Sequence, residues 1–311
     1  MVISFNNYLD FNEICKRNKL ENKMLVNIQI GSDEKIYFLF NEKIPERIDG
    51  MFVPTESNSA FYVLVLDVDW NDERIINENC YSLGTMKMND RFIQPVGDKL
   101  LLVASRCCYN DGNPEKNAAV VDYQGNIINE FCLGDGINKC LVREDGPIVT
   151  AYFDEGILGN YGWDEPLGAC GLKIWSPDGN TGVWESDRDI CDCYAVNVGA
   201  DGSVWYYYYD DFKLVRTDFK TEDEYDPEIE GADDFILTDD GLGLIMDSGY
   251  DDHGSFRAFH IKDGSITGAE ELSFEYNGSI QDLTIFATYG SKAVFSGPGS
   301  HLYIRKFASL C

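Results

Sequence analysis

Short apolar runs separated by turn residues recur along almost the whole of this 311-residue chain, and this rhythm limits its fold more than any other feature. Six runs each follow a glycine-containing turn, such as Asp145-Gly146 or Asp201-Gly202. Such pairs permit the positive φ angles that tight β-hairpins need. The six runs occupy residues 35–40, 99–103, 147–152, 203–208, 242–246 and 292–296. The pattern predicts antiparallel strands throughout, with residues 8–23 as the one candidate for a helix.

A second set of apolar runs follows the first and shows that the units repeat. Taken as third strands, these runs occupy residues 61–66, 118–122, 171–175, 213–217, 255–261 and 301–305. The acidic or amide residues that precede the first strands of five units are Asp90, Asn138, Asp192, Asp234 and Asp282. The intervals between them are 48, 54, 42 and 48 residues, and propeller blades repeat every ~40 to 50 residues. We therefore expect an all-β fold, a single β-propeller domain over residues 1–311 with about six four-stranded blades.

Two points of this architecture stay open. A β-sandwich or a pair of small β domains is the alternative, and the unit over residues 24–90 is long enough to contain an extra strand pair. The last unit lacks a fourth strand, whereas residues 2–5 form a short apolar run without a hairpin partner nearby. We expect this N-terminal strand to pair with the last blade and close the ring, which would leave no open sheet edge there.

The charge of the chain restricts its partners. There are 54 acidic and 25 basic residues, which gives a net charge of −29. Nucleic acid is disfavoured because its binding depends on Lys and Arg at the phosphates, and an anionic membrane is disfavoured for the same reason. No apolar run approaches the ~18 residues of a membrane span. A small cationic ligand or a protein partner is compatible with this charge, although the charge could serve solubility alone.

The cysteines indicate a reducing compartment. There are ten, and the first residues of the chain show no secretory signal. We expect a cytoplasmic protein in which all ten thiols are reduced and none forms a disulfide. The pairs Cys107-Cys108 and Cys191/Cys193 allow a zinc site as an alternative, although neither has the two-residue spacer of common zinc sites.

Strand alternation in a propeller brings the loops between second and third strands, and those between blades, to one face, here called the long-loop face. The loops of the first kind span residues 106–117, 152–165, 209–211 and 247–253, and the second of these is much longer than a hairpin requires. The candidate ligand-binding residues on this face are Tyr152, Asp154, Glu155, Asn160, Trp163, Asp192, Tyr194, Asn197 and Asp210. The alternatives are a self-packed loop with Trp163 and Tyr161 as its plug, Asp192 as a turn acceptor and Tyr194 as a core aromatic.

The recurring acidic position suggests a metal site at the mouth of the channel. The candidate ligands are Asp90, Asp192, Asp234 and Asp282. Converging carboxylates raise one another's pKa unless a cation is present, and their hard oxygens suit calcium or magnesium. The alternative is that each residue accepts a hydrogen bond from its own turn.

Residues 152–156, 159–163, 171–172 and 192–198 resemble a group of uncharacterised bacterial β-propeller-like proteins, over roughly residues 115–220. This resemblance implies a bacterial cytosolic origin and no activity. The chain is also loosely similar to gluconolactonase and streptogramin-lyase type propellers, which implies a divalent metal at the channel mouth. The histidine pattern of the lyase type is missing.

Catalytic motifs do not emerge from the sequence. There is no Gly-x-Ser-x-Gly elbow, helical histidine pair or phosphate loop, and the three histidines are scattered over the last two units. We therefore expect a non-catalytic binding scaffold that engages a protein or a small cationic ligand on its long-loop face. The alternative is a metal-dependent hydrolase or lyase that acts at the channel mouth.

Overall fold

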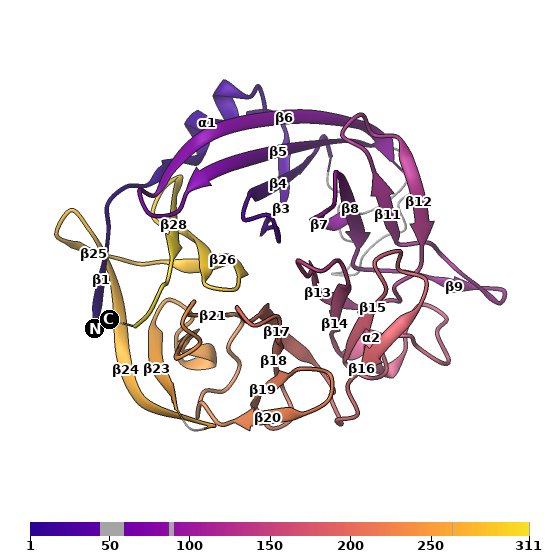
Figure 1. Cartoon of the computed structure of the whole chain (residues 1–311). Coiled ribbons are helices and arrows are strands. Elements are labelled where there is room, and N and C mark those ends of the chain that lie inside the picture. The colour runs from indigo at the N-terminus through magenta and orange to yellow at the C-terminus, as the bar shows by residue number, and fades with distance from the viewer. Residues whose placement is uncertain (44–58, 87–89, 263, 311) are drawn as a thin grey trace.

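Six blades, each with a core of four antiparallel strands, surround a central axis in the computed structural model, which describes residues 1–43, 59–86, 90–262 and 264–310 (Figure 1). Two further strands extend the sheet of one blade to six strands. The innermost strands of the six sheets face one another across the axis (Figure 1). This arrangement confirms the six-bladed β-propeller that the repeat predicts, and the β-sandwich alternative is wrong.

The strands of blades 1 to 3 follow one another along the chain from the innermost to the outermost. Blade 1 contains β3 (Met24–Ile30), β4 (Ile36–Asn41), β5 (Ser59–Asp69) and β6 (Arg74–Met86). Blade 2 contains β7 (Asp90–Val96), β8 (Lys99–Ala104), β11 (Ala118–Val121) and β12 (Ile127–Phe131). A hairpin in its loop contains β9 (Tyr109–Asn110) and β10 (Asn113–Pro114). Blade 3 contains β13 (Ile137–Val142), β14 (Ile148–Tyr152), β15 (Leu172–Trp175) and β16 (Gly182–Glu185).

Blades 4 to 6 complete the ring, and the last of them takes its outer strand from the N-terminal region. Blade 4 contains β17 (Cys193–Val198), β18 (Val204–Tyr208), β19 (Leu214–Thr217) and β20 (Glu222–Tyr225). Blade 5 contains β21 (Phe235–Leu237), β22 (Gly243–Asp247), β23 (Phe256–Lys262) and β24 (Ser265–Tyr276), and β25 (Ser279–Gln281) pairs with β24. Blade 6 contains β26 (Thr284–Tyr289), β27 (Lys292–Ser296), β28 (His301–Lys306) and β2 (Leu9–Asp10).

The second strands are the most buried elements of the molecule. Every residue of β4, β14, β18 and β22 is buried, because both faces of these strands lie against neighbouring blades. This explains why they read as continuous apolar runs rather than as alternating ones. The outer strands β12 and β16 are mostly exposed. The predicted second and third strands are confirmed in all six blades.

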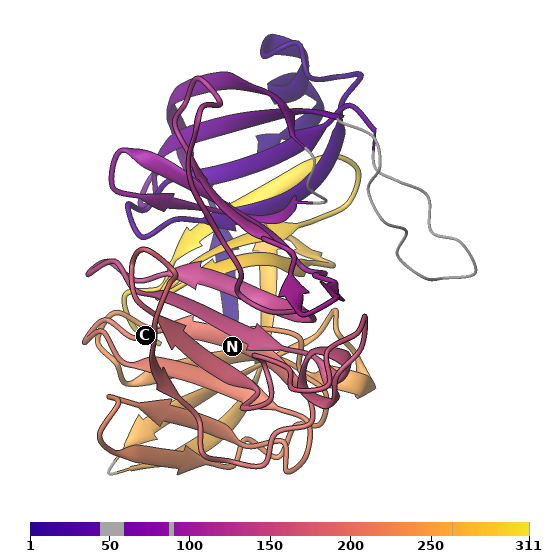
Figure 2. The same ribbon diagram turned by 90° about the vertical axis from the view of Figure 1, so that its right-hand side faces the viewer.

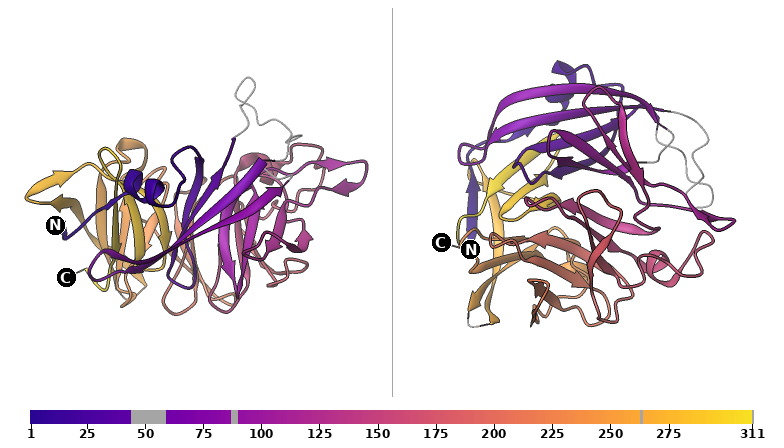
Figure 3. Two further views of the ribbon diagram at one scale, coloured as in Figure 1. Left: turned by 90° about the horizontal axis from the view of Figure 1, so that it is seen from above. Right: turned by 45° about the vertical axis from the view of Figure 1, so that its right-hand side comes forward.

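Blade 1 is long because its outer strands are long. β5 has 11 residues and β6 has 13, and within the described part of residues 24–90 there is no additional strand pair. The helical candidate at residues 8–23 contains α1 (Phe11–Arg17), which begins after Asp10, whose carboxylate accepts the Glu13 N–H at 3.1 Å. Figure 3 shows α1 at the rim of the ring. No helix in the described ranges is long and apolar enough to cross a bilayer.

The N-terminal region closes the ring, but not through the residues that the sequence suggested. β2 pairs with β28 and supplies the fourth strand of blade 6, with Leu9 opposite Leu302. Residues 2–5 form β1 (Val2–Phe5), which runs parallel to β24 at the outer edge of blade 5 (Figure 1). The expected pairing of residues 2–5 with the last blade is therefore wrong.

The side chain of Phe5 gives the physical reason for this placement of β1. Its ring lies 5.5 Å from that of Phe274 in blade 5 and 4.9 Å from that of Tyr303 in blade 6, measured between centroids. Phe5 is 4% exposed, and this burial requires β1 to lie over the seam between the two blades. Met1 and Ile3 pack against the same apolar cluster as Phe5, and burial of these side chains favours β24 as the partner strand.

The connection between β1 and β2 is held by a buried carboxylate. Glu73, which is 1% exposed, accepts hydrogen bonds from the backbone N–H groups of Asn6 at 2.5 Å and Asn7 at 3.2 Å. The Arg305 guanidinium lies 2.6 Å from the same carboxylate and also donates to the Ser4 carbonyl at 2.9 Å. Charge-assisted hydrogen bonds of this kind hold the N-terminal segment between blades 1 and 6.

Candidate functional site

Side chains of the innermost strands fasten neighbouring blades together near the axis. The Asn197 amide of β17 donates to the carbonyls of Phe235 at 3.0 Å and Gly290 at 3.1 Å, and its oxygen accepts the Gly290 N–H at 2.6 Å. These contacts join blades 4, 5 and 6. Asn197 is 0% exposed, so the structure places this candidate ligand-binding residue inside the frame that supports the mouth.

An ion pair crosses the channel below the mouth. Lys139 of β13 lies 3.1 Å from one oxygen of Asp234, and the Thr288 hydroxyl donates to the other oxygen at 2.8 Å. The pair thus links blades 3, 5 and 6. Asp234 is buried, and both of its carboxylate oxygens have partners from other blades.

Above these contacts a hollow opens at the mouth on the long-loop face. Its volume is about 380 Å³. It is lined by Asn138, Lys139, Phe153, Asp192, Tyr194, Asp233 and Ile285. These residues come from four different blades or the loops between them, so only the closed ring assembles the hollow.

Asp192 is the carboxylate with the most altered environment in this hollow. Burial, together with the nearby carboxylates of Asp154 and Asp210, raises the pKa of Asp192 to about 7. Its Oδ1 atom is shielded from solvent and has no hydrogen-bond partner among the described residues. Asp210 in turn accepts the Cys191 N–H at 2.7 Å. Three loops therefore bring carboxylates together where a cation would be stabilised.

The other candidate metal ligands do not join Asp192. Asp234 is paired with Lys139, Asp282 is exposed in the turn before β26, and the side chain of Asp90 lies outside the described residues. In the part of the chain that the structure describes, no three His, Cys, Asp or Glu residues are grouped so that they could hold a metal ion.

The two closely spaced cysteines near the mouth diverge. Cys191 is exposed in the loop before β17, whereas Cys193 opens that strand and is 0% exposed. The two thiols therefore do not lie on one face of a strand, because the strand begins only at the second of them.

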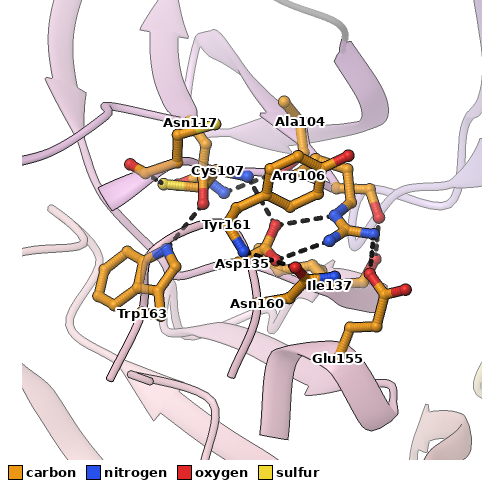
Figure 4. A network of polar contacts seen from close by, with 12 residues as sticks. Ala104, Arg106, Cys107, Asn117, Asp135, Ile137, Glu155, Asn160, Tyr161 and Trp163 are labelled. Atoms are coloured by element: carbon orange, nitrogen blue, oxygen red, sulfur yellow. Dashed lines mark hydrogen bonds and ion pairs between the residues drawn. The ribbon is translucent and has the colours of Figure 1, made fainter. Parts of the chain in front are cut away.

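The long loop of blade 3 packs against the loop of blade 2, as Figure 2 shows from the side. The Trp163 indole N–H donates to the Cys107 carbonyl at 2.7 Å (Figure 4). The Trp163 ring centroid lies 4.9 Å from that of Tyr109. The Tyr109 N–H donates to the Tyr161 carbonyl at 2.9 Å. Trp163 is 7% exposed, so it anchors the loop to the neighbouring blade, where the sequence had suggested either a ligand contact or a self-packed loop.

A half-buried arginine orders the same region. Arg106 makes two parallel hydrogen bonds of 2.9 Å to Asp135 and an ion pair with Glu155, and its guanidinium lies 4.3 Å from the ring centroid of Tyr161 (Figure 4). Bidentate pairing of this kind fixes both partners. α2 (Asp154–Leu158), which carries Glu155, is therefore held beside the mouth.

The candidate ligand-binding residues thus separate into three groups. Tyr152 is fully buried and its hydroxyl donates a hydrogen bond to the Leu133 carbonyl, and Glu155 forms an ion pair with Arg106. Asn160 accepts the Tyr161 N–H within its loop. The residues that the structure brings to the mouth are Asp154, Asp192, Tyr194 and Asp210.

Sequence reasoning missed several residues of the mouth. Asp233 and Phe153 line the hollow, whereas the sequence pattern pointed to their chain neighbours Asp234 and Asp154. The Tyr194 hydroxyl lies 2.6 Å from that of Tyr250, 56 positions later. No signal in a single sequence relates these two tyrosines, because only the packing of blade 4 against blade 5 brings them together.

Comparisons with known proteins support the fold alone. No protein-family model matches the chain, and no curated protein matches its sequence. A solved chain of the mitotic checkpoint complex has a TM-score of 0.55 at 8% identity, over 98% of this chain and 92% of that one. Virginiamycin B lyase from Staphylococcus aureus has a TM-score of 0.50 at 11% identity, over 96% of this chain and 98% of that one. Both are β-propellers.

Proposed function

We propose that this propeller is a non-catalytic binding scaffold that holds a cationic group, from a small ligand or a protein partner, at the mouth on its long-loop face. The observation that carries the proposal is the environment of Asp192. Its buried Oδ1 lacks a hydrogen-bond partner among the described residues, and burial, together with the nearby carboxylates of Asp154 and Asp210, raises its pKa to about 7. A positive charge in the hollow would give the buried oxygen a partner and would offset the repulsion among the three carboxylates.

The composition supports the same conclusion. A net charge of −29 attracts cations over the whole surface and steers them to the molecule. It opposes nucleic acid and anionic membranes, which we exclude as partners in this proposal. We also propose a cytoplasmic location and, from the resemblance over residues 115–220, a bacterial origin. The nine described cysteines are free thiols, which suits a reducing compartment.

Calorimetric titration with spermidine tests the proposal directly. We expect saturable binding to the parent protein and a loss of affinity of about tenfold in Asp192→Asn, which removes one charge from a partly desolvated site. Glu144→Gln is the matched control, because Glu144 is exposed in the β13–β14 hairpin on the opposite face. Equal weakening by the two substitutions would reduce the effect to net charge and contradict a site at the mouth.

The alternative of a metal-dependent hydrolase or lyase is tested in the same series. Chelator-treated protein is titrated with calcium and with magnesium. Binding of either ion that is tighter than spermidine binding and lost in Asp192→Asn would favour a metal centre over the scaffold. Heat signals no larger for these ions than for sodium at equal ionic strength would favour the scaffold.

A further inference from the structure

Four aromatic rings form a closed circuit beside the mouth. The rings, here called the aromatic circuit, belong to Tyr194, Tyr209, Phe212 and Tyr250. The distances between successive centroids are 6.0 Å, 5.4 Å, 6.0 Å and, from Tyr250 back to Tyr194, 6.5 Å. Tyr209 is 47% exposed and Tyr250 is 56% exposed. Two of the four rings therefore present aromatic surface to solvent.

The exposed rings are held in place from below. Tyr250 lies in the short 3-10 helix η1 (Gly249–Asp251), and its backbone N–H donates to the Glu230 carbonyl at 2.9 Å. A Cβ on Gly231 would overlap the Tyr250 ring, so the ring lies directly on this backbone. The Tyr209 N–H donates to the Asp192 carbonyl at 2.9 Å. The circuit is thus organised before any ligand arrives, which reduces the entropy cost of binding.

Negative charge borders the circuit. Asp192 precedes Tyr194 by two residues and lines the same hollow, and Asp210 directly follows Tyr209. Burial, the Tyr250 hydroxyl and the charge of Asp192 raise the pKa of Tyr194. Among the described residues, no Lys or Arg lies over any of the four rings, and the cation–π contacts involve other aromatic residues.

We propose that the aromatic circuit binds a methylated ammonium group, with trimethylammonium as the preferred form. This inference rests on the cationic site proposed above and names the chemistry of its ligand. Ring faces attract cations through their quadrupoles, and methylated ammonium groups are recognised by such arrangements of aromatic rings. A bare ammonium ion keeps its hydration shell and gains less from the rings. Choline and a trimethylated lysine side chain both carry the required group.

The first experiment compares tetramethylammonium with ammonium at constant ionic strength, by calorimetric titration of the full chain. We expect tetramethylammonium to bind about tenfold more tightly. Two further arms identify the source of the group: choline, and a lysine peptide with and without trimethylation. A preference for the trimethylated peptide over choline would assign the site to a protein partner, and the reverse would assign it to a small molecule; either result supports the proposal.

Substitutions in the circuit separate this inference from the proposed function. Tyr250→Leu removes a ring face while keeping apolar surface, and Tyr209→Leu is a second variant at an exposed position. Both should lose most of the preference for tetramethylammonium. Tyr250→Phe keeps the ring and should retain it. Tyr81→Leu is the control, since Tyr81 lies on β6, the outermost strand of blade 1, with its ring centroid 4.5 Å from that of Tyr123.

Each outcome decides between the two proposals. Ammonium bound as tightly as tetramethylammonium, or a preference that survives both leucine substitutions, would overturn the aromatic circuit as a ligand site and leave the cationic mouth standing. Failure of every cation to bind would overturn both. Asp192→Asn should weaken the two ions alike, because it removes charge and leaves the rings.

Discussion

Asp192 opposes folding stability at the position where we propose that a cation binds. Its pKa in the folded protein is about 7, above the ordinary value of an aspartate in an unfolded chain. Between these two pKa values the unfolded chain releases the proton while the folded protein keeps it, so folding stability falls as pH rises. A residue that costs stability at neutral pH is expected at a binding site rather than in a structural role.

The first prediction follows from this loss of folding stability at high pH. Asp192→Asn should unfold at a higher urea concentration than the parent at pH 8, with a gain of about 1 kcal/mol after allowance for solvent screening. The gain should shrink as pH falls from 7 towards 4, because the parent carboxyl becomes neutral in the folded state. Spermidine binding should weaken about tenfold between pH 8 and pH 6 in the parent. A stability gain that does not vary with pH would contradict the assignment.

The cysteines lead to a second prediction at the scale of residues. Cys107 and Cys132 have their sulfur atoms 3.6 Å apart, the first buried and the second half-buried. Burial raises the pKa of the Cys140 thiol to about 12. In reduced protein we expect ten thiols after denaturation without reductant, while in the native state the exposed Cys80 and Cys191 react first. Recovery of eight or fewer thiols from protein purified under reductant would contradict this expectation.

At the scale of elements, closure of the ring divides into two tasks. β2 completes the sheet of blade 6 through backbone pairing with β28. β1 covers the seam between blades 5 and 6 through Phe5, and the buried Glu73 fixes the link between the two strands. Edge pairing and apolar cover are thus supplied by separate short strands of the same N-terminal segment.

The third prediction tests the seam. Phe5→Ala should lower the free energy of unfolding by about 3 kcal/mol, since it removes a buried ring from an aromatic cluster and leaves a cavity. Val2→Ala is the matched control on the same strand, because Val2 is 58% exposed; it should change stability by less than about 0.5 kcal/mol. Equal effects in chemical denaturation would show that β1 acts only through its backbone.

At the scale of the whole molecule, polar contacts near the axis connect different blades. Asn197 joins blades 4, 5 and 6, and the pair of Lys139 and Asp234 joins blades 3 and 5, with Thr288 of blade 6 on the same carboxylate. Gln29 of β3 joins blades 1, 2 and 3 in the same way: its amide N–H donates to the Cys140 carbonyl of blade 3, and its amide oxygen accepts the Ile93 N–H of blade 2.

The fourth prediction follows from these shared contacts. Residues 1–311 should unfold as one cooperative domain, because the loss of any blade breaks cross-links in the others. Scanning calorimetry should give one transition in which the calorimetric and van't Hoff enthalpies agree. Two resolved transitions, or a van't Hoff enthalpy well below the calorimetric value, would show that groups of blades unfold separately.

Local patterns were sufficient to determine the strands and the architecture. Residues 204–208, which follow the turn at Asp201-Gly202, form a continuous run of aliphatic and aromatic residues because β18 is covered on both faces, and similar turns recur in every blade. The acidic composition and the position of the long-loop face also follow from the sequence, since strand direction alternates along the chain.

Tertiary structure alone decided which residues meet. Residues 2–5 could have paired with any open edge, and burial of the side chains of Met1, Ile3 and Phe5 favoured β24. Trp163 and Tyr250 are both aromatic loop residues, yet one is buried against blade 2 and the other is half exposed at the mouth. The environment of a side chain depends on neighbours that are distant in sequence, and only the closed ring brings those neighbours together.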